Sequence, residues 1–487
     1  MKKTLAIMLC LVMCAGVLVG CSKEENTETG VGTSGADTTV KESVLPEMDW
    51  GGKELVIGET NEFGLVSAVV TEDVTTTIGN AIYWRNARLK DKYNIELKML
   101  AEEDPATSVI RDAMSGESEI HILLDEVTGV KGALAQGVFA DLTTVKYIDL
   151  NSAGWNAQAN KDLSIRGYQY VATGDLNLHE KMGSHVLFCN LDMINNVSGE
   201  DIRQIVLDGN WTIEKMKTLV TNATVIDVTT GETSVYGLTN HYNYAFYNFL
   251  SAAYGVTICE KDDTDTPYFS FDDASLYEHT INAIDDLLKM YADKSTTYTA
   301  RYGSTTPSAV ELFQNKRSMF LSNTIEQGLS ALKSGTSFAY SVIPYPKYDA
   351  DGVAEYVSSK LYNMSTLIAI PYYASDLDFA GFGLQALNEL SGDVTYAYIE
   401  EQCKLKGSTD EIDYKLMELA LVDVTYDLGV VYNWGAIHIW VFTDRYDDAS
   451  GTFSIPVGGV NNFATLWAAD KILAHTELEE FLTNFTG

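Results

Sequence analysis

Positive charge is scarce in this chain. Its 487 residues include 33 Lys and Arg against 68 Asp and Glu, which gives a formal net charge of −35 at pH 7. A field of this sign repels phosphate-rich partners, so the composition excludes nucleic acid as a partner. It also disfavours anionic ligands and leaves neutral and cationic small molecules as candidates.

Cysteine is also scarce, with 6 in the whole chain. Half of them fall between residues 10 and 21, and the others are Cys189, Cys259 and Cys403. An odd, widely spaced set predicts neither a disulfide framework nor a metal site. We therefore expect buried, inert thiols, no bound metal and no cofactor.

The common catalytic motifs are missing. The sequence has no His-Glu-x-x-His and no Gly-x-Ser-x-Gly. Two stretches fit a loose dinucleotide-binding pattern, Gly30–Gly35 and Gly381–Ala386. The first has no strand before it, and the second lies inside an amphipathic helix, so neither predicts a nucleotide site. We expect no enzymatic activity.

The N-terminus carries an apolar run from Leu5 to Val19 behind two lysines. The run is shorter than the roughly 20 residues that span a bilayer, which is typical of a secretory leader. It ends in Leu18-Val19-Gly20-Cys21, which resembles the lipobox of bacterial lipoproteins. The resemblance implies a signal peptide over residues 1–20, a lipid on Cys21 and an extracytoplasmic protein anchored to the cell membrane. The alternatives are an ordinary signal peptide with an incidental cysteine, or an uncleaved anchor.

Residues 21–49 predict a flexible tether. They are rich in Gly, Ser, Thr, Asn and acidic residues and have almost no large apolar side chains, so they cannot bury enough surface to fold. A flexible chain of this length has an end-to-end distance of roughly 30 Å. The remainder is too long for a single hydrophobic core and predicts two lobes.

Strands and helices alternate at the start of the folded body. Strands are predicted at 54–58, 95–99 and 120–124, with helices at 79–93 and around 109–114. This alternation predicts an α/β fold with mainly parallel sheets flanked by helices, whose ligands bind beyond the carboxyl ends of the strands.

Further along, the pattern becomes more helical. A long helix is predicted at 274–291, and the chain from about Gly392 is mostly helical by pattern. The remaining predicted strands are 168–172, 185–189, 318–321, 338–342 and 366–370.

Four segments together resemble the extracellular solute-binding proteins of carbohydrate ABC transporters, the family 1 group that includes maltodextrin-binding proteins. The segments are 82–95, 170–174 together with 187–192, 313–320 and 340–347. Their order and spacing agree over residues 50 to about 440. Position 189 departs from the family, since it holds cysteine where an aromatic residue is frequent.

The resemblance implies a periplasmic-binding-protein type II fold, in which two lobes close over a ligand cleft. Lobe 1 would comprise 50–174 plus 361–391, and lobe 2 would comprise 175–360 plus 392–487. The implied function is that of a monomeric, membrane-tethered receptor that captures a sugar or oligosaccharide and delivers it to an ABC permease. A surface lipoprotein glycoside hydrolase, or a receptor for a peptide or polyamine on the same fold, remain alternatives.

Sugars bind to flat aromatic faces and to side chains that hold hydroxyls. Trp434 is the first aromatic candidate because its Asn and Gly neighbours suggest a loop that exposes the ring. The other candidates are aromatic residues in a polar patch and polar residues near expected strand ends or turns: Tyr242, Tyr244, Glu59, Asn61, Asp125 and Asp175.

Overall fold

The protein is described from a computed structural model, all of whose described residues belong to one unit, Ser43–Gly487. They are 43–60, 75–102, 104–241, 244–291, 295–300, 307–350, 356–359, 365–405, 410–422, 424–437, 442, 446–447, 452–453 and 460–485. The expected signal peptide, Cys21 and most of the expected tether lie outside this range.

The first sheet has four strands in the order β13-β3-β1-β2. β1 pairs in parallel with both β2 and β3, whereas β13 runs antiparallel to β3. The strands are β1 (Lys53–Thr60), β2 (Ile95–Glu102), β3 (Ile122–Glu126) and β13 (Thr366–Ala369).

Helices cover both faces of this sheet because its strands are apolar on both sides. In β3, Ile122 and Leu124 belong to one core and Leu123 to another, as alternating side chains of a strand require. The first core is closed by α2 (Thr77–Tyr93) and α14 (Leu377–Leu390), and the second by α3 (Pro105–Ser115) and α4 (Val127–Ala135).

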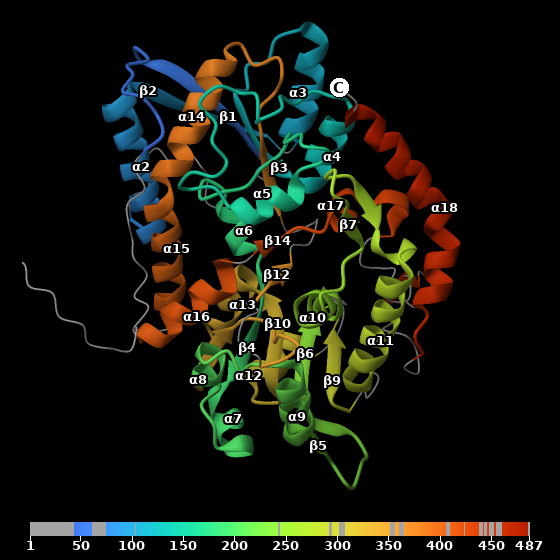
Figure 1. Cartoon of the computed structure of the whole chain (residues 1–487). Helices are drawn as coiled ribbons and strands as arrows, with labels where there is room; N and C mark the ends of the chain where they lie inside the picture. Colours follow the sequence, from blue (N-terminus) through green and yellow to red (C-terminus); the bar gives the residue numbers. More distant parts are fainter. Residues whose placement is uncertain are drawn as a thin grey trace, which may run out of the picture. The chain divides into compact units, whose positions relative to one another are not determined.

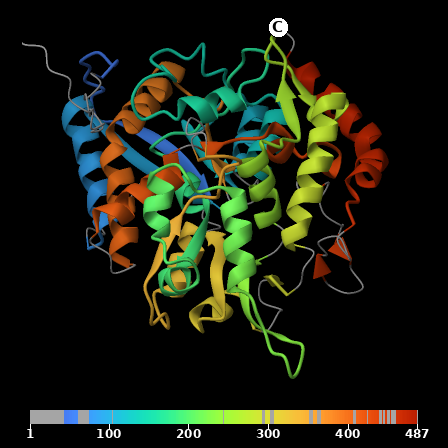
Figure 2. The same ribbon diagram turned by 60° about the horizontal axis from the view of Figure 1, so that its bottom comes forward.

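The second sheet has six strands in the order β11-β4-β10-β6-β5, with β9 also paired to β6. The inner strand β6 runs parallel to β10 and β9, and β4 runs antiparallel to β10 and β11. The strands are β4 (His185–Asn190), β5 (Val225–Ile226), β6 (Thr233–His241), β9 (Thr297–Ala300), β10 (Ser318–Thr324) and β11 (Tyr340–Ile343). The β5–β6 hairpin projects from the end of this sheet (Figure 2).

Helices also cover both faces of the second sheet, again by alternation along β4, where Leu187 and Phe188 enter different cores. One face packs on α7 (Leu191–Ser198), α9 (Ile213–Ala223) and α10 (Tyr244–Tyr254). The other face packs on α6 (Leu178–Met182), α12 (Ala309–Gln314), α13 (Ile325–Leu332), α15 (Gly392–Leu405) and α16 (Glu411–Val422).

Short elements lie between the two sheets (Figure 1). Two short strands, β12 (Ser358–Ser359) and β14 (Val424–Thr425), pair in parallel beside α5 (Ala157–Leu163), and we call them the crossing strands.

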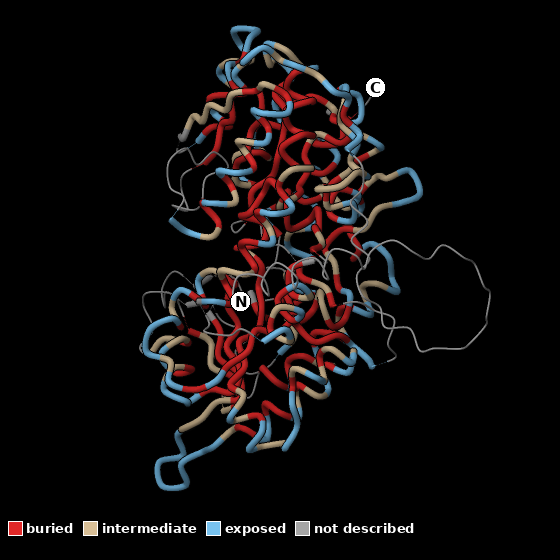
Figure 3. The backbone as a smooth tube through the Cα atoms, turned by 90° about the vertical axis from the view of Figure 1, so that its left-hand side faces the viewer, coloured by how far each residue is buried: buried red, intermediate tan, exposed pale blue. Residues whose placement is uncertain are grey.

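The remaining helices and strands are α8 (Ile202–Leu207), β7 (Cys259–Lys261), β8 (Pro267–Phe269), α11 (Ala274–Tyr291), α17 (Leu428–Tyr432), β15 (Tyr446–Asp447), β16 (Thr452–Phe453) and α18 (Phe463–Leu482). Figure 3 shows the buried backbone as two bodies joined by buried segments.

Most of the expected elements are present. The strands expected at 54–58, 95–99, 120–124, 185–189, 318–321, 338–342 and 366–370, and the helices at 79–93, 109–114 and 274–291, are confirmed with small shifts of their ends. The prediction of a strand at 168–172 is wrong. This segment makes only isolated bridges, Ile165 to Tyr168 and Ala172 to Ile368, because no neighbouring chain continues the ladder.

Candidate functional site

The parallel strands of the first sheet all end on the same side of the sheet, which we call its carboxyl edge. β1 ends at Thr60 and β3 at Glu126, and the antiparallel β13 begins beside them, with Thr366 opposite Glu126. In open α/β sheets this edge is where ligands bind.

The second sheet has an equivalent edge. β10 ends at Thr324, β6 at His241 and β9 at Ala300, and β4 begins there because His185 pairs with Thr324. Asn323 and Thr324 are buried polar residues at this edge. The rule that points to strand ends would have identified them had it been applied to the strand at 318–321.

One short segment joins these two edges. At its start, the Asn177 side-chain amide donates to the Thr366 carbonyl at 2.7 Å and accepts from the Thr366 hydroxyl at 2.6 Å. At its end, the Ser184 carbonyl accepts from the Ile325 N–H at 2.9 Å, directly after β10. The carboxyl edges of both sheets therefore lie on either side of residues 177–185, which include α6 (Figure 1).

Glu59 lies at the first edge, as the sequence predicts, and is only 5% exposed. Its charge attracts the buried Arg85 of α2, whose pKa burial nevertheless lowers to about 10. The guanidinium also donates to the Asn86 side chain at 3.0 and 2.8 Å. Glu59 is thus a buried carboxylate near a buried cation.

Asp125 also lies at this edge, at the end of β3. Its two oxygens accept the N–H groups of Ala106, at 3.1 Å, and of Glu126, at 2.8 Å. Burial raises the pKa of Asp125 to about 7. The side chain therefore ties the first turn of α3 to the sheet edge.

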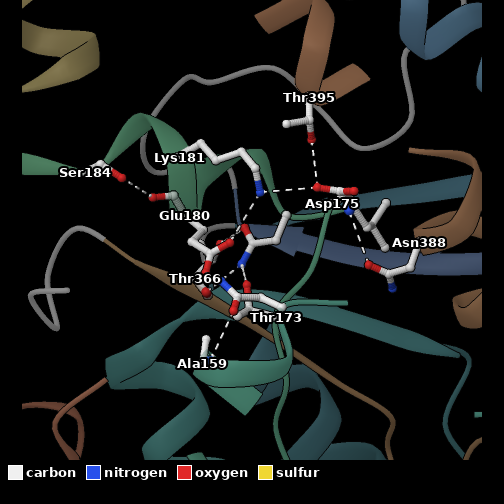
Figure 4. A network of polar contacts seen from close by, with 12 residues as sticks. Ala159, Thr173, Asp175, Glu180, Lys181, Ser184, Thr366, Asn388 and Thr395 are labelled. Carbon is white, nitrogen blue, oxygen red and sulfur yellow. Dashed lines mark hydrogen bonds and ion pairs between the residues drawn. The ribbon is translucent and has the colours of Figure 1, made fainter. Parts of the chain in front are cut away.

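Asp175 lies where the chain leaves the first sheet, in a buried network (Figure 4). Its carboxylate accepts from the Thr395 hydroxyl at 3.0 Å and lies 3.5 Å from the Lys181 ammonium, which is also 3.4 Å from Glu180. Burial of Lys181 lowers its pKa, but the attraction of the two carboxylates outweighs this effect and holds the pKa above the usual value.

Glycine is required immediately before Asp175. A side chain at Gly174 would collide with the Asn388 side chain and with the Gly154 carbonyl. The Gly154 carbonyl accepts the Asp175 N–H at 2.7 Å, so the two chain segments are in close contact at this crossing. Sequence reasoning identified Asp175 but missed Glu180 and Lys181, although they follow it closely in the sequence, because the pattern does not show that α6 turns Lys181 towards Asp175.

Asn240 faces the second core near the end of β6. It is fully buried, and neither atom of its side-chain amide has a hydrogen-bond partner among the described residues. An unsatisfied buried amide costs about 1–3 kcal/mol, which marks Asn240 as a candidate for binding a polar ligand.

The structure corrects the expectation for Trp434. The ring is 2% exposed and packs against Tyr432, Phe481 and Phe269, with ring centroids 5.2, 5.3 and 6.3 Å apart. Its neighbours Asn433 and Gly435 have φ values of 50° and 66°. They form a tight turn that inserts the ring into the core instead of exposing it.

The structure does not place the side chains of the three other candidates, Asn61, Tyr242 and Tyr244. Asn61 and Tyr242 lie outside the described residues, and Tyr244 is described only as the first residue of α10. Cys189, Cys259 and Cys403 are buried and form no disulfide bond among the described residues, as expected.

A cavity of about 440 Å³ lies beside the crossing strands. It is lined by α5, by β7 and by residues 425–428, with Lys161, Asp162, Glu260 and Lys261 among its charged groups. Mixed charges and partial enclosure are compatible with a polar ligand.

The comparisons with known proteins give the fold. No family model and no curated protein matches the chain. Solved structures do match. The ABC substrate-binding protein Lmo0181 from Listeria monocytogenes, in complex with cycloalternan, has a TM-score of 0.50 at 14% identity, covering 87% of this chain and 98% of that chain.

Two further structures agree. UspC from M. tuberculosis has a TM-score of 0.54 at 12% identity, covering 86% of this chain and 100% of its own. The galacto-N-biose/lacto-N-biose I-binding protein of an ABC transporter from Bifidobacterium longum, in complex with lacto-N-biose, has a TM-score of 0.54 at 13% identity, covering 89% and 98%. This chain has their two-lobed α/β fold. Among its described helices, none has the length and apolar content needed to cross a bilayer.

Proposed function

We propose that the protein is a receptor that captures a sugar or oligosaccharide between its two lobes and passes it to an ABC permease. The observation that carries this proposal is the placement of both carboxyl edges on either side of residues 177–185. A ligand held there contacts both sheets at once, so closure of the lobes buries it.

A neutral carbohydrate fits the chemistry of these edges. Glu59 and Asn240 offer a carboxylate and an amide, which hold hydroxyls. The net charge of −35 disfavours anionic ligands. The similar proteins from Listeria and Bifidobacterium are in complex with cycloalternan and lacto-N-biose, which supports a sugar as the ligand.

The proposed mechanism is binding without covalent chemistry. Hydrogen bonds to a charged partner contribute about 1.5–3 kcal/mol each. Aromatic contacts in the cleft add about 0.5–1.5 kcal/mol beyond buried area. Tyr242, Tyr244 and Asn61 remain the proposed contacts beside Glu59, Asp125 and Asp175.

We further propose that the lobes are 50–174 plus 361–391 and 175–360 plus 392–487, in a monomer anchored outside the membrane through lipid on Cys21. The tether then keeps the receptor at a high effective concentration near the permease. Mass spectrometry of the membrane-extracted protein tests the anchor, since a Cys21→Ala variant would lose the lipid mass.

A thermal-shift screen over neutral sugars, peptides and polyamines tests the ligand class. A ligand that binds only the folded protein stabilises it by RT ln(1 + [L]/Kd), which is about 2.7 kcal/mol at 100 times Kd. A sugar is expected to raise the melting temperature. Stabilisation by peptides or polyamines alone would contradict the proposal, as would chromatographic detection of shorter sugars released by the protein.

A further inference from the structure

Two tyrosines stand on a rigid backbone at the opposite edge of the first sheet. β13 begins at the carboxyl edge with Thr366 and runs antiparallel to β3, so its end at Ala369 lies where the parallel strands begin. Beyond it, Pro371 bridges to Phe139, the Tyr372 N–H donates to the Val138 carbonyl at 2.7 Å, and the Tyr373 carbonyl accepts from Ser118 at 2.8 Å. Both residues are thus fixed from two sides.

The two side chains point outward. Tyr372 is 56% exposed and Tyr373 is 39% exposed, and the rings meet edge to face with centroids 5.2 Å apart. Paired exposed aromatic rings on a fixed backbone lose little conformational freedom when a ligand stacks on them.

A cavity of about 370 Å³ lies against these rings. Its apolar wall includes Phe139, Tyr170 and Phe485, and the last two rings pack edge to face with centroids 5.3 Å apart. Its polar side chains are Asp141 and Thr144. The volume falls within the usual range for small-molecule sites, about 300–1,000 Å³.

Asp141 is held in a fixed orientation. Its Oδ1 accepts from the Thr143 N–H and the Gln169 N–H, each at 3.1 Å, and the Thr143 hydroxyl lies 2.9 Å from both carboxylate oxygens; among the described residues, this shared hydroxyl is the one donor to Oδ2. Because a carboxylate has about four acceptor positions, Oδ2 can accept another hydrogen bond. Burial and the Asp141 charge raise the pKa of Tyr170, so its hydroxyl stays a donor.

We propose that this cavity is a second carbohydrate-binding site, which holds a neutral polysaccharide chain outside the cleft. The more exposed Tyr372 ring stacks on the apolar face of a pyranose ring, the perpendicular Tyr373 ring contacts the sugar from the side, and Asp141, Thr144 and the tyrosine hydroxyls bind its hydroxyls. The Asp141 carboxylate and the chain's net charge of −35 exclude a phosphate-bearing or acidic polymer.

The site lies at the far edge of the first sheet, so it is independent of the proposed cleft. Binding there would keep the receptor on a polymer while the cleft remains available for a shorter sugar. The two sites can therefore be tested separately.

Affinity electrophoresis in native gels tests the proposal, with soluble starch, dextran, hydroxyethylcellulose, arabinoxylan and galactomannan as probes. The wild type is expected to be retarded by at least one polymer. In that gel, Tyr372→Ala/Tyr373→Ala should weaken the apparent affinity about tenfold or more, because the stacking ring and the ring that contacts the sugar from the side are both lost. The matched control is Tyr396→Ala, at an exposed tyrosine of α15, which should leave the retardation unchanged.

Each outcome decides the question. Retardation in none of the five gels, or equal retardation of the wild type and the double variant, overturns the second site. Sedimentation that shows a dimer in the wild type and a monomer in the double variant would assign the tyrosines to a second copy of the chain and also overturn it. Thermal shifts by short sugars report on the cleft, so failure of one site does not imply failure of the other.

Discussion

Asp125 shows how a single buried carboxylate links folding to pH. Burial favours its neutral form, so its pKa in the folded protein is about 7 against 3.8 for the free group. A raised carboxyl pKa means that the folded state binds more protons than the unfolded state between these values. Its contribution to stability is therefore present below about pH 4 and is lost as the pH rises towards about 7.

Replacing Asp125 with Asn removes this titration. We expect the free energy of unfolding of the wild type, relative to Asp125→Asn, to fall by on the order of 2 kcal/mol between about pH 4.5 and about pH 8. Urea denaturation at the two pH values measures the difference. Asp91→Asn, at an exposed position of α2, should show no such change. A constant difference for both variants would contradict the assignment.

Trp434 shows why local sequence misleads about single residues. Asn and Gly neighbours are frequent in exposed loops, but the same residues adopt the positive φ of tight turns inside a core. Gly435 allows the turn to lie against Ala474 of α18, where any side chain would collide. This contact joins residues about forty positions apart, and no local pattern contains it.

Trp434→Ala should behave as a core substitution. We expect it to lower the free energy of unfolding by about 3–5 kcal/mol, because it removes a fully buried aromatic side chain. The variant molecules that remain folded should bind sugar with the wild-type dissociation constant. Trp84→Ala, at a ring that is 57% exposed, should change stability by less than about 1 kcal/mol. A large loss of sugar affinity in folded Trp434→Ala would restore the ring as a ligand contact.

At the scale of elements, α6 and the residues before it form the joint between the sheets. The helix has five residues, all of them buried, including the charged pair Glu180 and Lys181. Removing one partner of such a buried pair leaves the other charge in a low-dielectric environment. The ion pair therefore stabilises the joint only while it is complete.

Lys181→Met tests this joint. We expect the free energy of unfolding to fall by about 3–5 kcal/mol, and the second substitution Glu180→Gln in the same chain to recover much of the loss. Lys415→Met is the control, because its pair with Glu411 is exposed and contributes at most about 1 kcal/mol. Equal effects of the two lysine substitutions in urea denaturation would contradict the role of the buried pair.

The apolar strands were predictable and the polar one was not. β1, β3, β4 and β10 have runs of Val, Ile, Leu, Phe or Met that read as buried strands. β6 carries Thr, Ser, Asn and His, yet it is an inner strand of the second sheet, because its neighbours β10 and β9 supply the ladder. Such context is tertiary and is absent from a local pattern.

At the scale of the whole molecule, the sequence predicts the two-lobed fold, but not the contacts that join its parts. Glu59 and Asp125 lie at the carboxyl ends of β1 and β3, as expected, because strand ends are visible in the sequence. The contacts of Asn177 with Thr366 and of Asp175 with Thr395 join residues 189 and 220 positions apart. Only the folded chain shows them.

The central claim is that a sugar binds at the edge that carries Glu59. Titration calorimetry with the sugar that gives the largest thermal shift tests it most directly, using wild type, Glu59→Gln and the control Glu54→Gln at the exposed start of the same strand. We expect the dissociation constant of Glu59→Gln to rise about 10- to 100-fold, because a hydrogen bond to a charged group contributes about 1.5–3 kcal/mol. Glu54→Gln should bind as the wild type does. A stably folded Glu59→Gln with the wild-type dissociation constant would show that the sugar binds elsewhere.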